Sequence, residues 1–346
     1  MTCDPIDIEK WCAAMIIIQI APEDLLETRF AYSPLVELTL SRRLFHVKPF
    51  KHSMGRWVED ARQAMNNIEL PYMDTLIKYR GYIPDFLTPT PDQPENDIEA
   101  ALAGLLRTPP HVVRLAMEES NLCPGKDLED DEIIKQFMLY PQEALGCLAE
   151  EMRFYWQRVL APQWHQVRAI LDGDVLYRAR QMALGGHDVV ISDLHPSIHY
   201  DHDAGRITIH KEHRDWEMHL DIEGRGLQVV PAVFSASHFH WQVFEEYTPM
   251  LIYTPRGAGN LYATAPDPSP ALEVLLGGGR ASVLESLLTP LSTSELATRL
   301  HMTSGAISQH LSRLKEAGLV ESQRSGRWVY YQLSDRGMQF VNLFAT

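Results

Sequence analysis

The 346-residue sequence has few cysteines, no long apolar run and a deficit of positive charge, and each shortage excludes a class of protein. The four cysteines, Cys3, Cys12, Cys123 and Cys147, form no C-x-x-C pair, which is typical of reduced thiols and excludes a disulfide framework. The early run AAMIII is too short to span a membrane, and acidic residues precede it where a secretion signal needs basic ones. We therefore expect a soluble, cytoplasmic protein with no membrane partner.

Signatures of catalysis are also missing. The glycine run GGGR at 277–280 lacks the Lys-Ser/Thr pair and the preceding strand of a phosphate-binding loop, so it is interpreted as a hinge between two domains. The chain has no H-E-x-x-H motif and no catalytic dyad of defined spacing. We expect a protein that is not an enzyme and that has no cofactor.

The deficit of positive charge is uneven along the chain. The net charge is −15, from 31 Lys and Arg against 46 Asp and Glu. Residues 280–346 hold seven basic and five acidic residues, a balance of +2, which leaves 24 basic and 41 acidic residues, or −17, elsewhere. An acidic body disfavours non-specific wrapping by DNA and would confine any DNA contact to the mildly basic C-terminal part.

The C-terminal part opens with two predicted helices. Four apolar residues recur at helical spacing in RASVLESLLTP: Val283, Leu284, Leu287 and Leu288. Pro290 ends that helix. The next segment, STSELATRL, begins with a capping box, because Ser292 can accept from the amide three residues on while Glu295 reaches back.

A third helix follows after the short connection HMT. Its predicted N-cap is Thr303, and Ile307, Leu311 and Leu314 face the core at intervals of four and three. Gly318 then stops the helix.

The opposite face of this helix consists of small or polar residues: Ser304, Gly305, Ser308, Gln309, Ser312 and Arg313. A recognition helix needs little bulk at its start, donors and acceptors for base edges, and amides for phosphate. Gln309 suits an adenine edge and is the best single candidate for specificity. For the helix alone, an ordinary solvated face remains the alternative.

Two β-prone runs, LVESQ and WVYYQL, follow and are joined by RSGR, where Gly326 can supply the positive φ of a tight hairpin. Arg324 and Arg327 at the tip suit backbone phosphates or a minor groove. The second run contains three aromatic residues: Trp328, Tyr330 and Tyr331. They either pack the base of the hairpin or form a stacking platform for single strands.

These segments together resemble the ArsR family of bacterial transcription regulators, through S-Q-H-L, E-A-G-L-V, R-x-G-R and Y-Y-x-L. The resemblance implies a homodimeric winged helix-turn-helix protein that binds double-stranded DNA, usually represses, and releases DNA when an effector binds. The resemblance implies that the residues facing DNA are Ser304, Gly305, Ser308, Gln309 and Ser312, with Arg324 and Arg327 in the wing. His310 is interpreted as a packing or phosphate-contacting residue. The cysteine pair of metal-sensing members is absent from STSELATRL, so thiolate sensing of arsenic, cadmium or lead there is not expected.

Residues before this part read as mainly helical. A buried strand is predicted at 14–20 and a proline-rich loop at 82–96. Helices are predicted at 97–106, 110–120 and 128–138. A longer helical signal from Pro141 should break at Pro162, where aromatic residues gather as core or as the wall of a small-molecule pocket.

From Ile198 to Tyr253 the pattern changes to short β-prone runs, RITIH, EMHLDI, GLQVVPAVF and MLIYTP, which predict one small sheet. This segment is rich in histidine: His195, His199, His202, His210, His213, His219, His238 and His240. With Asp193, Asp201 and Asp203 they could supply a zinc or iron site, but surface histidines are the favoured interpretation, so no metal is expected.

The region before the C-terminal part also resembles a bacterial domain of unassigned activity that precedes ArsR-type domains, through RFAYSPLVE, GYIPDFLTP and YWQRVLAPQW. The predicted fold is α+β and predominantly helical. The predicted divisions are a helical domain at 1–196, a β-rich subdomain at 197–270 and a winged helix-turn-helix at 271–346. The function expected is sequence-specific regulation by a homodimer on an inverted-repeat operator, with repression as the mode that the resemblance implies. The N-terminal domain is expected to serve dimerisation, effector sensing or both. The alternatives are a metal-dependent enzyme that uses the histidine-rich segment 193–240, and a winged domain that serves protein contacts only.

Overall fold

The structure of the chain is a computed structural model that describes residues 15–46, 54–77, 83–91, 97–121, 131–210, 217–235, 239–243, 246–258, 269–288, 290–325 and 328–344. Two compact units are present. Unit 1 comprises Met1–Lys48, Asp60–Pro162 and Tyr177–Thr254, and unit 2 comprises Pro49–Glu59, Gln163–Leu176 and Pro255–Thr346. No helix among the described residues is long and apolar enough to cross a membrane.

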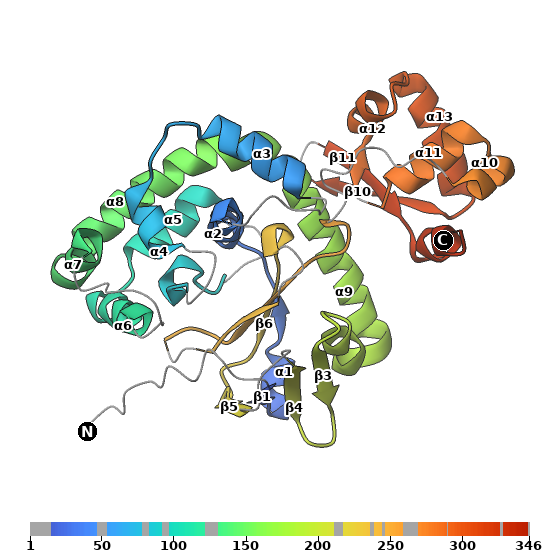
Figure 1. The fold of residues 1–346 in the computed structure, drawn as a ribbon. Coiled ribbons are helices and arrows are strands. Elements are labelled where there is room, and N and C mark those ends of the chain that lie inside the picture. Colours follow the sequence, from blue (N-terminus) through green and yellow to red (C-terminus); the bar gives the residue numbers. More distant parts are fainter. Residues whose placement is uncertain are drawn as a thin grey trace. The chain divides into compact units, whose positions relative to one another are not determined.

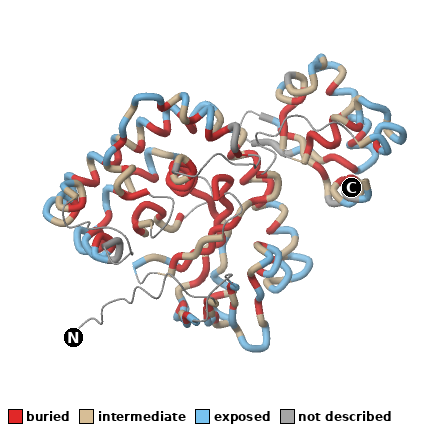
Figure 2. The backbone as a smooth tube through the Cα atoms, in the orientation of Figure 1, coloured by how far each residue is buried: buried red, intermediate tan, exposed pale blue. Residues whose placement is uncertain are grey.

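The helices of unit 1 are drawn in blue and green in Figure 1. They are α1 (Pro22–Leu26), α2 (Pro34–Arg43), α4 (Pro71–Leu76), α5 (Ile98–Leu106), α6 (Pro110–Asn121), α7 (Glu132–Leu139) and α8 (Pro141–Tyr155), with single turns at Leu44–His46, Asp85–Leu87 and Val233–Ser235. Helix α8 contacts α4, α5, α6 and α7, and its inward side chains are buried (Figure 2). The helices predicted at 97–106 and 110–120 are confirmed, and the third begins at Glu132 after its Asp131 cap.

The predicted break at Pro162 is confirmed. Helix α8 ends at Tyr155, and a π-helical turn over Trp156–Leu160 and a 3₁₀ turn over Ala161–Gln163 precede α9 (Trp164–Ser192). Tyr155 and Trp156 are buried, and the Tyr155 hydroxyl lies 3.0 Å from Ser41 Oγ. Both aromatic side chains therefore belong to the core. Helix α9 contributes to both units, as does α3 (Gly55–Ala64).

The β-prone runs form two four-stranded sheets rather than the single sheet predicted. The first has the order β3 (Ile198–Asp201), β4 (Arg206–His210), β1 (Met15–Gln19), β5 (Glu217–Asp221). The second has the order β2 (Arg29–Phe30), β6 (Gln228–Pro231), β8 (Met250–Tyr253), β7 (His240–Gln242). Each sheet takes one strand from the first thirty residues. The prediction of a separate β-rich subdomain at 197–270 did not include these strands.

Alternation explains how the first sheet is buried on one face. Ile16 and Ile18 are fully buried on β1, and they oppose Ile209 and Ile207 across the antiparallel pair with β4. Because side chains alternate across a strand, these residues share one face. That face belongs to a core cluster that also includes Ile191 near the end of α9. The strand predicted at 14–20 is thus confirmed.

Unit 2 contains the C-terminal helices and a three-stranded sheet. They are α10 (Pro270–Leu276), α11 (Gly278–Ser286), β9 (Leu291–Ser292), α12 (Thr293–Arg299), α13 (Ser304–Glu316), β10 (Val320–Ser325), β11 (Trp328–Leu333) and α14 (Asp335–Asn342). The sheet order is β10-β11-β9, and all of its pairs are antiparallel. The helices α10 to α14 contribute to one apolar cluster, which fixes α13 against the body of the unit.

Candidate nucleic-acid interface

The turn between α10 and α11 lies inside unit 2. Leu272 of α10 and Ala281 of α11 are fully buried in the same apolar cluster, and Gly277 joins the helices with a φ of 78°. The hinge between domains expected at 277–280 is therefore wrong, because both flanking helices pack into one core. The glycines instead make a sharp corner beside α13.

The start of α12 is closed by the predicted capping box. The Ser292 amide donates to Glu295 Oε2 at 2.8 Å, and the Glu295 amide donates to Ser292 Oγ at 3.3 Å. The Ser292 hydroxyl also donates to Glu295 Oε2 at 2.7 Å. These reciprocal bonds satisfy amides that a helix start leaves open, so α12 is fixed by residues three apart.

Helix α13 has the N-cap and the buried apolar face that the sequence predicts. Thr303 Oγ1 accepts from the Ala306 amide at 3.2 Å, and Ile307, Leu311 and Leu314 are buried. The helix ends at Glu316, and Gly318 follows with a φ of 69°. One face of α13 is therefore anchored along its length, and the other is left to solvent.

The exposed face of α13 carries Ser304, Gly305, Ser308, Gln309, Ser312 and Arg313, as expected. The Ser308 hydroxyl donates to the Ser304 carbonyl at 2.8 Å, and Arg313 Nη1 lies 3.2 Å from Glu316 Oε2. Within the described part of the chain, the Gln309 amide has no hydrogen-bond partner. It is the polar group on this face that is most available to a ligand.

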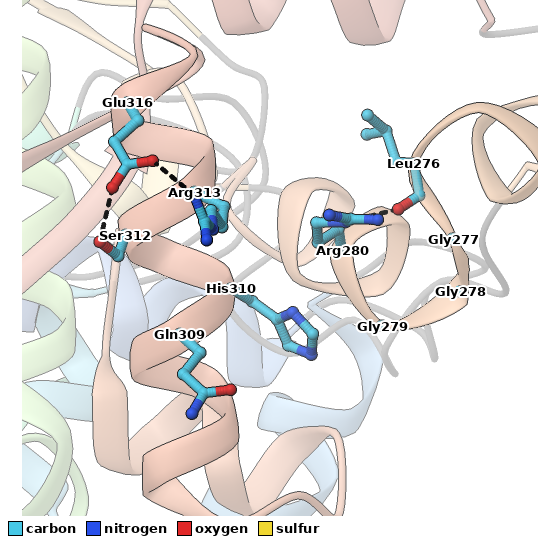
Figure 3. Close-up of a pocket in the computed structure, with 10 residues that line it drawn as sticks. All are labelled: Leu276, Gly277, Gly278, Gly279, Arg280, Gln309, His310, Ser312, Arg313 and Glu316. Atoms are coloured by element: carbon cyan, nitrogen blue, oxygen red, sulfur yellow. Dashed lines mark hydrogen bonds and ion pairs between the residues drawn. The ribbon is translucent and has the colours of Figure 1, made fainter.

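An open depression of about 830 Å³ lies between α13 and the corner at Gly277–Arg280. Figure 3 shows Gln309, His310 and Arg313 on one side and Arg280 on the other. Arg280 Nε donates to the Leu276 carbonyl at 2.5 Å. The ionisable groups that line the depression are thus two guanidinium groups, the carboxylate of Glu316 and the imidazole of His310.

The predicted hairpin forms beside α13. Strands β10 and β11 pair in register from Val320 with Leu333 to Ser325 with Trp328. The Arg324 backbone lies opposite Val329, whereas Gly326 and Arg327, predicted for the tip, lie outside the described residues. The hairpin contacts α13 through β10.

Two of the three aromatic residues of β11 pack inward. Tyr330 is buried, and its hydroxyl donates to the His165 carbonyl of α9 at 3.3 Å. Burial, with the Glu295 carboxylate nearby, raises the pKa of Tyr330 to about 12. Tyr331 packs on the apolar cluster of unit 2. A stacking platform built from these two rings is therefore excluded, and they pack the base of the hairpin.

Known proteins resemble the C-terminal part of this chain. Residues 279–322 match the family model "Bacterial regulatory protein, arsR family". The HTH-type transcriptional regulator Rv2034 of Mycobacterium tuberculosis (strain ATCC 25618 / H37Rv) is 38% identical over 77 residues, which are 22% of this chain and 72% of that protein. The chain belongs to the ArsR family.

Two other relatives match shorter stretches of this ArsR-family chain. The arsenic resistance transcriptional regulator ArsR1 of Pseudomonas putida is 40% identical over 52 residues, 15% of this chain and 41% of its own length. The HTH-type transcriptional repressor SmtB of Mycobacterium tuberculosis is 45% identical over 51 residues, 15% of this chain and 38% of its own length. The chain thus spans about two fifths of the length of these curated relatives.

Sequence reasoning missed two features of this ArsR-family domain. Helix α10 was not predicted. It exposes two apolar side chains, Val274 and Leu275, which are 86% and 60% accessible. Arg280 was assigned to the hinge and to the start of the following helix, with no role in binding, yet it lines the depression beside α13. The apolar run PALEVLL after Ser269 was a usable signal for α10. The approach of Arg280 to α13 is a tertiary contact that no local pattern encodes.

The described histidines of the segment 193–240 are dispersed in the structure, whereas His213 and His238 lie outside the described residues. His195 Nδ1 accepts from the Ser197 amide at 3.1 Å, whereas His199 is exposed on β3. Asp193 pairs with Arg178, and Asp201 lies 3.3 Å from Arg206. No group of three potential metal ligands occurs among the residues that the structure describes. The carboxylates next to these histidines are thus engaged with arginines.

Proposed function

We propose that the chain is a DNA-binding transcription regulator that reads its operator with α13. The observation that carries this proposal is the two-sided character of α13, whose apolar side is buried while its other side exposes small and hydrogen-bonding residues from the N-cap onward. Small residues at the start allow a helix to approach the base edges of a major groove. Membership of the ArsR family supports the same function.

Within this proposal, Gln309 reads a base. Its side-chain amide presents a donor and an acceptor, which match the N7 and N6 groups of adenine. Ser304, Gly305 and Ser308 lie nearer the helix start and are too short to reach far, so they permit close approach. His310 and Arg313 lie at the flank of the helix and suit the phosphate backbone.

Arg324 and Arg327 are proposed to hold the backbone from the wing. In the sequence, Arg324 belongs to β10 near its end, and Arg327 immediately precedes β11. Arginine side chains on a projecting hairpin bind phosphates without reading sequence. Replacing both by alanine should weaken binding to all duplexes alike and lower the salt slope by roughly one per lost contact.

A homodimer is proposed as the binding species. Residues 280–346 carry a net charge of only +2, so one domain offers few phosphate contacts. Unit 2 also exposes apolar side chains on α10 and after α14, namely Val274, Leu275 and Leu343. These residues are a candidate surface for contact between two copies, and on an inverted repeat the two α13 helices of a dimer would enter major grooves about 34 Å apart. Repression, the activity named for the relative SmtB, and release on effector binding to unit 1 are part of the proposal.

Footprinting on the chain's own promoter tests the proposal. A two-fold symmetric footprint is expected, and its absence would contradict the dimer. Gln309→Ala should weaken operator binding by roughly 1–3 kcal/mol per half-site and leave random DNA nearly unaffected. The matched control is Gln339→Ala, which truncates an exposed glutamine of α14 and should change neither affinity. Equal losses on operator and random DNA for Gln309→Ala would reject base reading.

A further inference from the structure

The depression between the Gly277–Arg280 corner and α13 contains an arginine that base reading does not use. Arg280 is fixed at the rim by its Nε bond to the Leu276 carbonyl, 2.5 Å long (Figure 3). Within the described part of the chain, its two terminal amino groups have no partner. A guanidinium held in this way keeps donors for an anion without losing further side-chain freedom.

The other side of the depression supplies further donors from α13. His310, which is half-buried, and Arg313, which is exposed, both line it from positions three residues apart on the helix. The carboxylate of Glu316 already pairs with Arg313 at 3.2 Å, so an entering anion would meet Arg280 and His310 first. The lining as a whole carries one more guanidinium than carboxylate.

The absence of a side chain at Gly279 lets His310 lie close to the Gly277–Arg280 corner. A methyl group added at Gly279 would lie 2.8 Å from His310 Nε2, closer than real side-chain contacts allow. The imidazole therefore packs directly on the α11 backbone, one residue before Arg280. The depression remains open to solvent with a volume of about 830 Å³. That volume accommodates a phosphate group with its neighbouring sugars.

The location relative to α13 indicates which phosphate source fits. Gln309, the proposed base-reading residue, also lines the depression. A helix in the major groove has a phosphate strand on each side of it, because the groove is only about 12 Å wide. Strand β10 of the hairpin contacts α13, and so does α11, at whose start the corner offers cationic donors.

We propose that this depression binds one backbone phosphodiester of DNA, with Arg280 as the main donor and His310 and Arg313 beside it. The proposal rests on the proposed DNA-binding function and adds a phosphate site outside α13 and the wing. The chemistry it requires is that of any phosphate oxyanion, so a free phosphate is the competing source.

The test compares Arg280→Gln with Arg336→Gln, which removes the same charge from an exposed position on α14. Affinity for a random-sequence duplex and for the footprinted operator is measured over a series of salt concentrations. Arg280→Gln should weaken both by the same factor, on the order of tenfold, and lower the salt slope by about 0.9 per monomer. Arg280→Lys should retain the salt slope, because the point charge remains. Arg336→Gln reports the effect of net charge alone.

The outcomes separate this inference from the proposed function. Equal effects of Arg280→Gln and Arg336→Gln, with Gln309→Ala still losing operator preference, would overturn the phosphate site and leave DNA binding intact. A wild-type chain that binds neither duplex would reject both. Matching thermal midpoints of the variants confirm that the fold is preserved.

A second arm distinguishes the phosphate sources. Inorganic phosphate and pyrophosphate are titrated into the DNA-free protein while the backbone amide resonances of Gly277, Gly278 and Gly279 are followed by NMR. A phosphodiester site should show weak, unsaturated shifts that Arg280→Gln abolishes. Saturable binding of either ion that depends on Arg280, with DNA affinity unchanged in Arg280→Gln, would assign the depression to a free anion and overturn the proposal.

Discussion

Two carboxyl groups of unit 1 and two helix caps of unit 2 form hydrogen bonds over very different distances along the chain. In unit 1, Asp24 Oδ1 accepts from the Gly226 amide at 2.9 Å, across 202 residues. Glu37 accepts from the Val233 and Phe234 amides at 2.6 and 3.0 Å, across 196 and 197 residues. In unit 2, the capping bonds of Ser292 and Thr303 span three residues each.

This difference indicates which substitutions should destabilise each unit most. A buried carboxyl group that accepts two distant amides ties together segments that lie far apart in the sequence, so its loss affects packing beyond one helix end. A cap affects one helix end, because its partners belong to the same turn. We therefore expect single polar substitutions to cost more in unit 1 than in unit 2.

The largest effect is expected for Glu37→Ala. This change leaves the Val233 and Phe234 amides without an acceptor in a site where Glu37 is fully buried. The expected loss is about 3 kcal/mol, because each unsatisfied buried group costs roughly 1–3 kcal/mol. Calorimetric unfolding measures it, with Glu150→Ala on the exposed side of α8 as control. Losses of similar size in the two variants would contradict the central role of Glu37.

The pH dependence of the same residue sharpens the comparison. Burial, opposed by the Phe234 and Val233 amides, raises the pKa of Glu37 to about 8. The folded state then holds a proton between the ordinary glutamate pKa of 4.5 and about 8 that the unfolded state releases, so stability from this group falls as pH rises through that window.

Glu37→Gln removes this titration and keeps one acceptor oxygen. The advantage in thermal midpoint of the native chain over Glu37→Gln should therefore shrink as pH rises from about 5 to about 8. A midpoint difference that stays constant over this range would show that Glu37 does not change its protonation there.

A smaller effect is expected where unit 2 packs its backbone closely. A methyl group at Gly337 of α14 would lie 1.9 Å from the Leu319 carbonyl oxygen, so Gly337→Ala must displace α14. Overpacking of this kind costs about 1–3 kcal/mol. Gly305→Ala on α13 is the matched control, because no atom lies within 4 Å of the added methyl. It should leave stability unchanged or raise it by up to about 1 kcal/mol. An undisturbed Gly337→Ala variant would show that α14 shifts freely.

The same contrast explains what the sequence could predict. Helix α13 was predicted from the Thr303 cap and from the spacing of Ile307 and Leu311, all of which are local signals. The hairpin was predicted because its two strands adjoin one turn. Strand β1 was also recognised, but its parallel pairing with β5 and antiparallel pairing with β4 were not, because those partners follow about two hundred residues later.

The candidate site divides in the same way. Gln309 and the small residues around it were predicted from one helix face, and their exposure is as expected. Arg280 was not, because its importance depends on the approach of the α11 start to His310. Only the packing of two helices brings these residues together, and that packing arises from the whole apolar cluster.

The smallest effects are expected from the two caps of unit 2, and their ratio tests whether local bonds there act independently. Thr303 is exposed, so its Ala306 amide can exchange its bond for one with water, and Thr303→Ala should cost about 0.5 kcal/mol. Ser292 is buried and reciprocally bonded to Glu295, so Ser292→Ala should cost about 1.5 kcal/mol. Thr303→Ser keeps the hydroxyl and serves as control. Because the two caps close different helices, the double variant should lose the sum of the two costs, measured by calorimetry. A loss clearly larger than the sum would show that α12 and α13 depend on each other's caps, and the distinction between a locally closed unit 2 and a long-range unit 1 would fail.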